Sequence, residues 1–208
     1  MNMNEYTFLV VIAGVLFVGA MSPGPSFLVV AKNSLSQSRA HGLATAVGTG
    51  LGVAIFAILA SLGVTTLLEQ VPSAFVAFKI VGGLYLLYIA SKIWRGAKQP
   101  LLADQTQSEA DVSLWRAFVH GLITQTSNPK TALVIAGIFA AFVPASPPPN
   151  TIWLVACIAF VIDFSWYAAV ALTLSTQASR NVYQRAKTGF DRVTAVFLGA
   201  IGAKLVLG

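Results

Sequence analysis

Charged side chains are scarce in this sequence. Lys, Arg, Asp and Glu make up 10% of its 208 residues, whereas hydrophobic residues make up 56%. So little charge cannot cover the surface of a soluble fold with this much apolar material, which excludes a soluble domain. The net charge of +6 comes from Lys and Arg residues that lie mainly between long apolar runs. This pattern indicates membrane topology rather than a nucleic-acid partner, so we expect a protein embedded in the lipid bilayer.

Residues that carry catalysis are equally few. The lone cysteine, Cys157, excludes an internal disulfide. No Gly-rich phosphate-binding loop is present, which excludes ATP hydrolysis of the P-loop type. A membrane enzyme would need a nucleophile beside a base, or an acidic metal cluster. One mid-span Asp163 and one peripheral His120 supply neither. We therefore expect no enzymatic activity, no metal and no cofactor.

The N-terminal segment lacks the basic residues of a signal peptide and carries Glu5, so we expect an uncleaved first span. With about 20 apolar residues needed for each crossing, the sequence predicts an all-α integral membrane protein with six transmembrane helices. They cover residues 7–31, 42–68, 74–94, 117–143, 151–175 and 190–207. The expected organisation is a single transmembrane domain over residues 1–208.

Basic residues mark the first, third and fifth connections between these spans and are absent from the second and fourth. They are Lys32 and Arg39, then Lys92, Arg95, Lys98 and Arg116, then Arg180, Arg185, Lys187 and Arg192. By the positive-inside rule, the odd connections are cytoplasmic, including the longest one at about 96–116. Both termini are then expected outside.

The two halves of the chain resemble each other. SPGPSFLVVA at 22–31 aligns with SNPKTALVIA at 127–136, and FKIVGGLYLLYIASK at 78–92 aligns with FDRVTAVFLGAIGAK at 190–204. Because each half, about 1–95 and about 117–208, holds three spans, the two repeats would be inverted in the membrane. Inverted repeats with a broken first helix are typical of secondary transporters with a midplane site. Chance similarity between apolar segments is the alternative.

Prolines interrupt the first helix of the first half. A proline inside a helix removes a hydrogen bond and costs roughly 3 kcal/mol or more, so a function should offset the break at Pro23, Gly24 and Pro25. Ser22 is a good N-cap residue, and we expect a second half-helix to start at Pro23. Ser26 follows in that half-helix and would add a polar contact.

The first helix of the second half repeats the break, with Asn128 as N-cap, Pro129 in the first turn and Lys130 beside it. Half-helix N-termini present unpaired N–H groups and partial positive charge, to which Lys130 adds a full charge. We therefore expect a carboxylate-bearing substrate between the breaks, with Thr131 as a further polar contact. The alternative is that the prolines only kink closely packed helices.

Asp163 lies near the middle of the fifth span. An ionised carboxylate there costs a few kcal/mol unless it is paired, hydrated or protonated. Asp163 is therefore either a proton or ion site, or a structural partner of Lys130.

In the second span, Ala44, Gly48 and Gly52 recur at a spacing of four. Such a pattern serves either helix packing within the chain or a homodimer.

Four stretches together resemble the LysE/RhtB family of amino-acid exporters: SPGPSFLVVAKNSLSQSRAHGLATAVGTGLG, KIVGGLYLLYIASKIWRGA, GLITQTSNPKTALVIAGIFAAFVP and IDFSWYAAVALTLS. The resemblance covers essentially the whole chain and is greatest to the threonine and homoserine exporter branch. It implies a bacterial inner-membrane protein that exports amino acids in exchange for protons. The family's motif positions are Ser22, Pro23, Gly24, Pro25, Asn128, Pro129, Lys130 and Asp163. Ser26 stands where many relatives would carry an amide or an acid.

The sequence thus predicts a secondary transporter that exports neutral or polar amino acids, such as threonine or homoserine, by proton antiport. The predicted substrate-binding residues are Ser22, Pro23, Gly24, Pro25, Ser26, Asn128, Pro129, Lys130 and Thr131, with Asp163 as the proton-coupling residue. Two alternatives stay open: export of another small carboxylate-bearing metabolite, or a passive channel or membrane assembly subunit, because gating and coupling leave no motif of their own.

Overall fold

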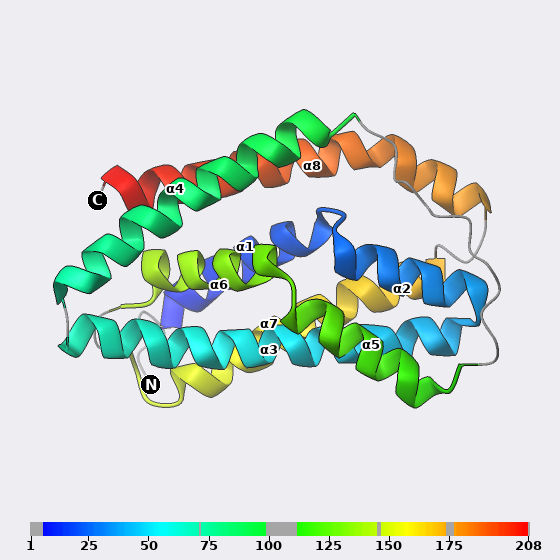
Figure 1. Cartoon of the computed structure of the whole chain (residues 1–208), viewed down its shortest axis with the longest axis horizontal. Helices are drawn as coiled ribbons and strands as arrows, with labels where there is room; N and C mark the ends of the chain where they lie inside the picture. Colours follow the sequence, from blue (N-terminus) through cyan, green and yellow to red (C-terminus); the bar gives the residue numbers. More distant parts are fainter. Residues whose placement is uncertain (1–5, 71, 99–111, 145–146, 174–176, 208) are drawn as a thin grey trace.

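The computed structural model describes residues 6–70, 72–98, 112–144, 147–173 and 177–207, which form eight α-helices and, within those ranges, no strand. The expected all-α fold is confirmed. The helices are α1 (Thr7–Met21), α2 (Pro25–Ser36), α3 (Arg39–Gln70), α4 (Pro72–Gly96), α5 (Leu114–Thr126), α6 (Pro129–Phe142), α7 (Thr151–Thr173) and α8 (Gln177–Leu207). The start of α1 and the end of α8 lie at the same end of the molecule (Figure 1).

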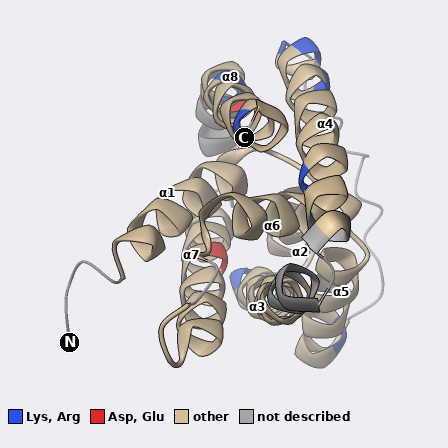
Figure 2. Ribbon diagram, turned by 90° about the vertical axis from the view of Figure 1, so that its left-hand side faces the viewer, with Lys and Arg blue, Asp and Glu red and all other residues tan. Residues whose placement is uncertain are grey.

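The short helices α1 and α6 lie between two pairs of long helices. The helices α4 and α8 run antiparallel along one side, and α3 and α7 run antiparallel along the other, where α5 packs on α3 (Figure 1). The same layers appear in the view along the helices, where most of the ribbon carries no charge (Figure 2). The main apolar core joins these layers through buried Ile12, Leu86, Phe139, Val155 and Leu198. The helix breaks therefore face the middle of the molecule.

The first break differs in detail from the prediction. The helices α1 and α2 meet at a bend of 59°, but α2 begins at Pro25 rather than Pro23, and its N-cap is Gly24. Ser22, which was predicted to be the N-cap, instead ends α1. The reason is the second proline: a residue that precedes proline is driven to extended geometry, so Gly24 cannot join the helix. Its backbone is indeed extended.

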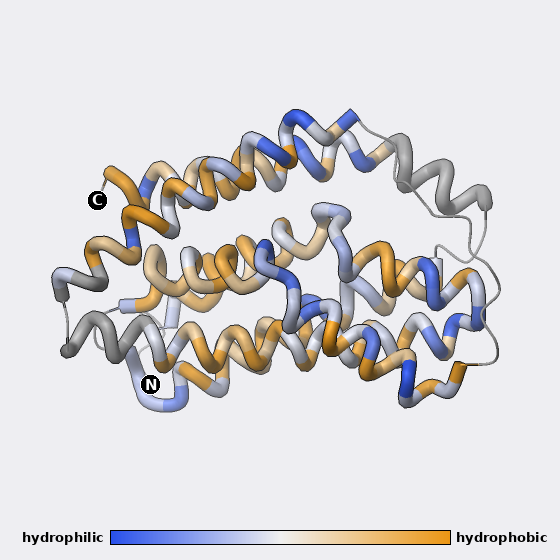
Figure 3. The backbone as a smooth tube through the Cα atoms, viewed as in Figure 1, coloured by the Kyte–Doolittle hydropathy of each residue, from blue (hydrophilic) through white to orange (hydrophobic). Residues whose placement is uncertain are grey.

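The second break follows the prediction. The helix α5 ends at Thr126, Asn128 caps α6, and Pro129 occupies the first turn of α6. The link between α5 and α6 is a hydrophilic segment between largely apolar helices (Figure 3). Both halves of the chain therefore contain the same order of elements, a broken pair followed by two long helices.

The predicted six spans are not confirmed. Within the described residues, Arg39–Gly63, Val76–Gly96 and Thr151–Thr173 are each long and apolar enough to cross a membrane, and α1 with α2 qualifies as a fourth, broken span. The helices α5 and α6 are only 13 and 14 residues long, and the first turns of α8 are polar. Most of the predicted connection at 96–116 lies outside the described residues, which omit 99–111.

The small residues of α3 serve packing within the chain. A Cβ atom added at Gly48 would lie 2.1 Å from the carbonyl oxygen of Phe118, and one at Gly52 would lie 2.8 Å from the Cβ atom of Gln125. The helices α3 and α5 therefore approach almost backbone to backbone. On another face, a Cβ atom at Gly50 would lie 3.1 Å from an aromatic ring of α7. These contacts account for the pattern without a second copy of the chain.

Candidate functional site

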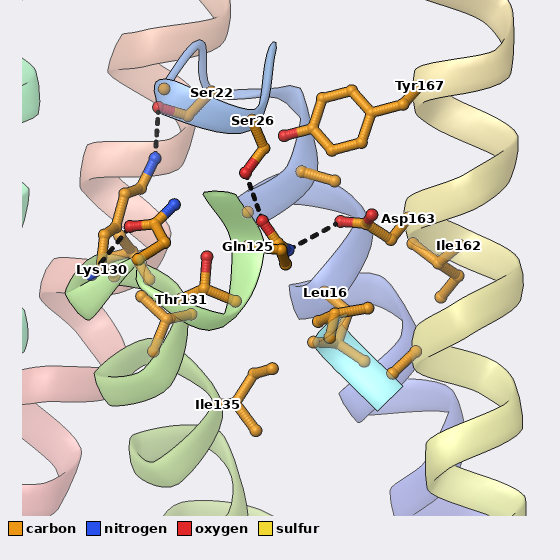
Figure 4. A pocket seen from close by; sticks show the side chains of 18 residues that line it. Leu16, Ser22, Ser26, Gln125, Lys130, Thr131, Ile135, Ile162, Asp163 and Tyr167 are labelled. Atoms are coloured by element: carbon orange, nitrogen blue, oxygen red, sulfur yellow. Dashed lines mark hydrogen bonds between the residues drawn. The ribbon is translucent and has the colours of Figure 1, made fainter. Parts of the chain in front are cut away.

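The two helix breaks meet at a cavity of about 50 Å³ (Figure 4). This volume exceeds the roughly 10–15 Å³ that one water molecule needs. Its apolar lining comes from α1, α3, α6, α7 and α8. Its polar lining residues are Ser22, Ser26, Gln125, Asn128, Lys130, Thr131, Asp163 and Tyr167. A small polar molecule fits this combination of size and lining.

Lys130 reaches from the second break to the first. It stands in the first turn of α6, and its Nζ donates a hydrogen bond to Ser22 Oγ at the end of α1, 3.1 Å away. A Cβ atom added at Gly24 would lie 3.9 Å from the same Nζ, so the ammonium group lies beside the N-cap of α2. A full positive charge therefore adds to the partial positive charge of a helix N-terminus.

The start of α6 is built to receive an anion. The side-chain oxygen of Asn128 accepts a hydrogen bond from the backbone N–H of Lys130 at 3.1 Å, which confirms the predicted cap. Pro129 has no N–H group to leave unpaired. Thr131 follows in the cavity lining, and its backbone N–H is the first-turn donor of α6 that neither the Asn128 cap nor Pro129 accounts for. A carboxylate is a natural acceptor for such a group.

Asp163 lies across the cavity from Lys130, in the middle of α7 (Figure 4). Its side chain is buried, and its Oδ1 accepts a hydrogen bond from Gln125 Nε2 at 3.3 Å. Its Oδ2 has no hydrogen-bond partner among the residues that the structure describes. Gln125 also accepts a hydrogen bond from the Ser26 hydroxyl. Gln125 therefore fixes Asp163 relative to the first turn of α2, and the second carboxylate oxygen is buried without a hydrogen-bond partner among the described residues.

Lys130 and Asp163, both within the described part of the chain, do not form the ion pair considered from the sequence. The Lys130 ammonium group bonds to Ser22, while Asp163 bonds to Gln125. Gln125 stands between the two charged groups in the cavity (Figure 4). The cavity thus presents a cation on one side and a carboxylate on the other.

A second acidic residue, Asp191 of α8, reaches the first break. Its Oδ1 accepts a hydrogen bond from the Ser22 hydroxyl at 3.3 Å, and its Oδ2 forms an ion pair with Lys187 at 2.7 Å. Lys187 also donates hydrogen bonds to two carbonyl oxygens at the end of α4. Asp191 and Lys187 are 4% and 7% exposed. Buried polar contacts thus run without interruption from α4 and α8 to Lys130.

Most of the predicted site residues meet at the cavity. Those that line it are Ser22, Gly24, Ser26, Asn128, Lys130, Thr131 and Asp163. Pro23, Pro25 and Pro129 are not among the lining residues and instead set where the helices end and begin. The structure therefore separates the predicted residues into those that face the cavity and those that create the breaks.

Sequence reasoning missed Gln125 and Asp191. Gln125 stands in the polar stretch TQTSN, three residues before Asn128 and inside the predicted span at 117–143, where an amide needs partners. Asp191 and Lys187 lie four residues apart on a helix, a spacing that favours an ion pair. The basic residues around Lys187 predict that it lies in a cytoplasmic connection. In the structure its side chain is buried.

The arrangement can hold a zwitterion. Lys130 and the helix N-termini favour a carboxylate, whereas the unpartnered, buried oxygen of Asp163 favours an ammonium group or a proton. Within the described residues, no group of three or more His, Cys, Asp or Glu side chains is placed to hold a metal ion. The cavity therefore offers a cationic group on one side and a carboxylate on the other.

Similarity to known proteins extends over nearly the whole chain. The model of the LysE type translocator family matches residues 17–208, which include both breaks. The threonine efflux protein of Escherichia coli (strain K12) is 29% identical over 198 residues, 94% of this chain and 96% of that protein. The uncharacterized membrane protein PA4757 of Pseudomonas aeruginosa is 31% identical over 207 residues, 95% of this chain and 94% of that protein. No solved structure matches the chain.

Proposed function

Because the chain belongs to the LysE type translocator family, we propose that it exports threonine-like amino acids from the cytoplasm in exchange for protons. The name of its relative, a threonine efflux protein, supports an amino acid as the transported molecule. The cavity is small and combines a cluster of polar side chains with an apolar lining, which supports a small neutral or polar amino acid, such as threonine or homoserine, over a large one. The proposed activity is secondary active transport.

The observation that carries this proposal is the placement of Lys130 and Asp163 on opposite sides of one cavity, unpaired with each other (Figure 4). Charges inside a membrane are costly unless they are compensated. An amino acid compensates both at once: its carboxylate binds Lys130, Ser22 and the first turn of α6, and its ammonium group binds Asp163. Ser26 and Thr131 lie within the same lining and would contact the polar side chain of the substrate.

Coupling to protons follows from competition at Asp163. One of its oxygens has no hydrogen-bond partner within the described residues, and this oxygen takes either the substrate ammonium group or a proton. The site then changes the side of the membrane to which it opens while the Asp163 carboxylate is neutralised by one of the two. This amounts to exchange of amino acid for proton. Asp163 is the proposed coupling residue for this reason.

The proposed architecture is six spans in two inverted repeats, at about 1–95 and about 117–208. The repeated order of a broken pair and two long helices supports it, and broken helices at a repeat interface suit alternating access. The positive-inside rule places the odd connections in the cytoplasm of a bacterial inner-membrane protein and both termini outside. The small residues of α3 are used for packing within the chain. They therefore do not argue for a homodimer, which stays a prediction.

Uptake into inverted inner-membrane vesicles tests the proposed function. Vesicles that carry the protein are supplied with labelled threonine, homoserine, leucine and lysine, with and without an imposed pH gradient, beside vesicles that lack it. We expect accumulation of threonine and homoserine that depends on both the protein and the gradient. No accumulation of any of the four in tight vesicles would refute amino-acid export. Accumulation that is independent of the pH gradient would refute proton coupling but not amino-acid export.

A further inference from the structure

A buried carboxylate of α8, that of Asp191, already bonds to Ser22, one of the partners that the substrate carboxylate would use. The Ser22 hydroxyl accepts a hydrogen bond from Lys130 at 3.1 Å and donates one to Asp191 at 3.3 Å. A hydroxyl group can donate one hydrogen bond while it accepts another, so Ser22 links the cation to the anion. Asp191 is 4% exposed, so this contact is shielded from water. Charges interact more strongly in such an environment than they do in water.

Asp191 lies near two lysines, which it contacts in different ways: it reaches Lys130 through the Ser22 hydroxyl and Lys187 directly. Its other oxygen pairs with Lys187 at 2.7 Å, and Lys187 is held in turn by carbonyl oxygens at the end of α4. The group of Lys130, Asp191 and Lys187 therefore carries two cations and one anion. A substrate carboxylate supplies the second anion, after which each lysine has a carboxylate of its own.

We infer that Asp191 substitutes for the substrate carboxylate while the site is empty, and yields Ser22 and Lys130 to the substrate when it binds. The inference rests on the proposed function. Asp191 is then a positioning residue for one step of the transport cycle, the return of the empty carrier after its substrate has left. Without Asp191, Lys130 would make that step with no anion nearby, which is costly inside a membrane.

A neighbouring hydrogen bond also holds α8 against α1. The Thr194 hydroxyl, one turn further along α8, donates a hydrogen bond to the carbonyl oxygen of Val18 in α1 at 3.0 Å. Thr194 is completely buried. Asp191 therefore holds α8 against the end of α1, and the substrate loosens this contact when it takes over Ser22 and Lys130.

Comparing net efflux with exchange tests this role in proteoliposomes loaded with labelled threonine. The Asp191→Asn variant should lose net efflux into threonine-free buffer by at least about tenfold. It should keep exchange against external threonine close to the wild-type rate, because the substrate compensates Lys130 in both directions. A purely structural Asp191 would lower both rates together, and that outcome would overturn the inference.

Two further variants sharpen the comparison. Lys187→Gln frees Asp191 to compete harder for Ser22 and Lys130, so the KM for threonine should rise, whereas Asp191→Asn should lower it. Arg192→Gln is the matched control, because this neighbouring cation is exposed and lies over the Trp94 ring at 5.4 Å. It should leave both rates unchanged.

A measurement without substrate separates failure of the inference from failure of the proposed function. Cys157 is replaced by alanine, Thr194→Cys is introduced, and reaction with a small thiol reagent is followed in the absence of amino acids. Asp191→Asn, or the charge-balanced pair Asp191→Asn with Lys187→Gln if the single variant folds poorly, should label several-fold faster. Unchanged labelling would overturn the inference even if threonine is transported. Faster labelling in a protein that transports no amino acid would refute the proposed function alone.

Discussion

Replacing Lys130 by methionine removes the cation that we assign to the substrate carboxylate. The side chain keeps a similar length and loses its charge, so the first turn of α6 and its Asn128 cap should persist. Ser22 loses a donor but retains Asp191 as its acceptor. The expected defect is therefore in recognition of the carboxylate rather than in folding.

The size of the effect follows from the bond that is lost. An ammonium group and a carboxylate about 3 Å apart attract each other by roughly 5 kcal/mol at an effective dielectric constant of about 20. Desolvation of both groups offsets much of this, and hydrogen bonds to charged groups contribute roughly 1.5–3 kcal/mol net. The apparent affinity for threonine should therefore fall by roughly 10-fold to 100-fold.

Competition with labelled threonine measures this change, using threonine and threoninamide, which lacks the carboxylate. Lys130→Met should weaken threonine and leave threoninamide nearly unaffected, so that the preference for the carboxylate disappears. Lys204→Met is the matched control: this lysine bonds to the Ala141 carbonyl oxygen at 3.3 Å and does not line the cavity. An unchanged preference for threonine over threoninamide in Lys130→Met would refute the assignment.

Three further predictions concern coupling, the cavity wall and helix packing. Asp163→Asn should abolish the response of threonine accumulation to a pH gradient in vesicles, and a wild-type response would contradict its coupling role. Gln125→Leu leaves two buried groups without their partner and should destabilise the protein by about 1–3 kcal/mol, seen as a lower thermal midpoint in detergent. Gly121→Ala places a Cβ atom 2.2 Å from the Thr45 carbonyl oxygen and should cost about 1–3 kcal/mol. Gly63→Ala meets no atom within 4 Å and should be neutral or stabilising by up to about 1 kcal/mol; equal midpoints for the two glycine variants would contradict the close packing of α3 on α5.

The helix breaks are predictable from the sequence because their causes are local. Asn128 followed by Pro129 specifies a helix start within a few residues, and the structure has that start. The break at Pro23 and Pro25 is equally visible, but its exact start depends on which proline dominates. The constraint that Pro25 places on Gly24 moves the helix start by two residues and turns Ser22 from a cap into a cavity residue.

The partners of the site residues are not predictable in this way, because they come from distant parts of the chain. Ser22 meets Asp191, which lies 169 residues away, and Ser26 meets Gln125, which lies 99 residues away. Composition indicates that a buried charge needs compensation, but not which residue provides it. For this reason Lys130 could be identified as a site residue while its neighbour Asp191 could not.

Equilibrium binding of labelled threonine to the purified protein tests the central claim most directly, because it asks whether the cavity holds a zwitterion without relying on transport. The account predicts saturable binding that homoserine displaces, and that neither threoninamide nor 3-hydroxybutyrate displaces at the same concentrations, since each lacks one of the two charges. Equal displacement by all three compounds, or no saturable binding of threonine, would contradict a site built from Lys130 on one side and Asp163 on the other.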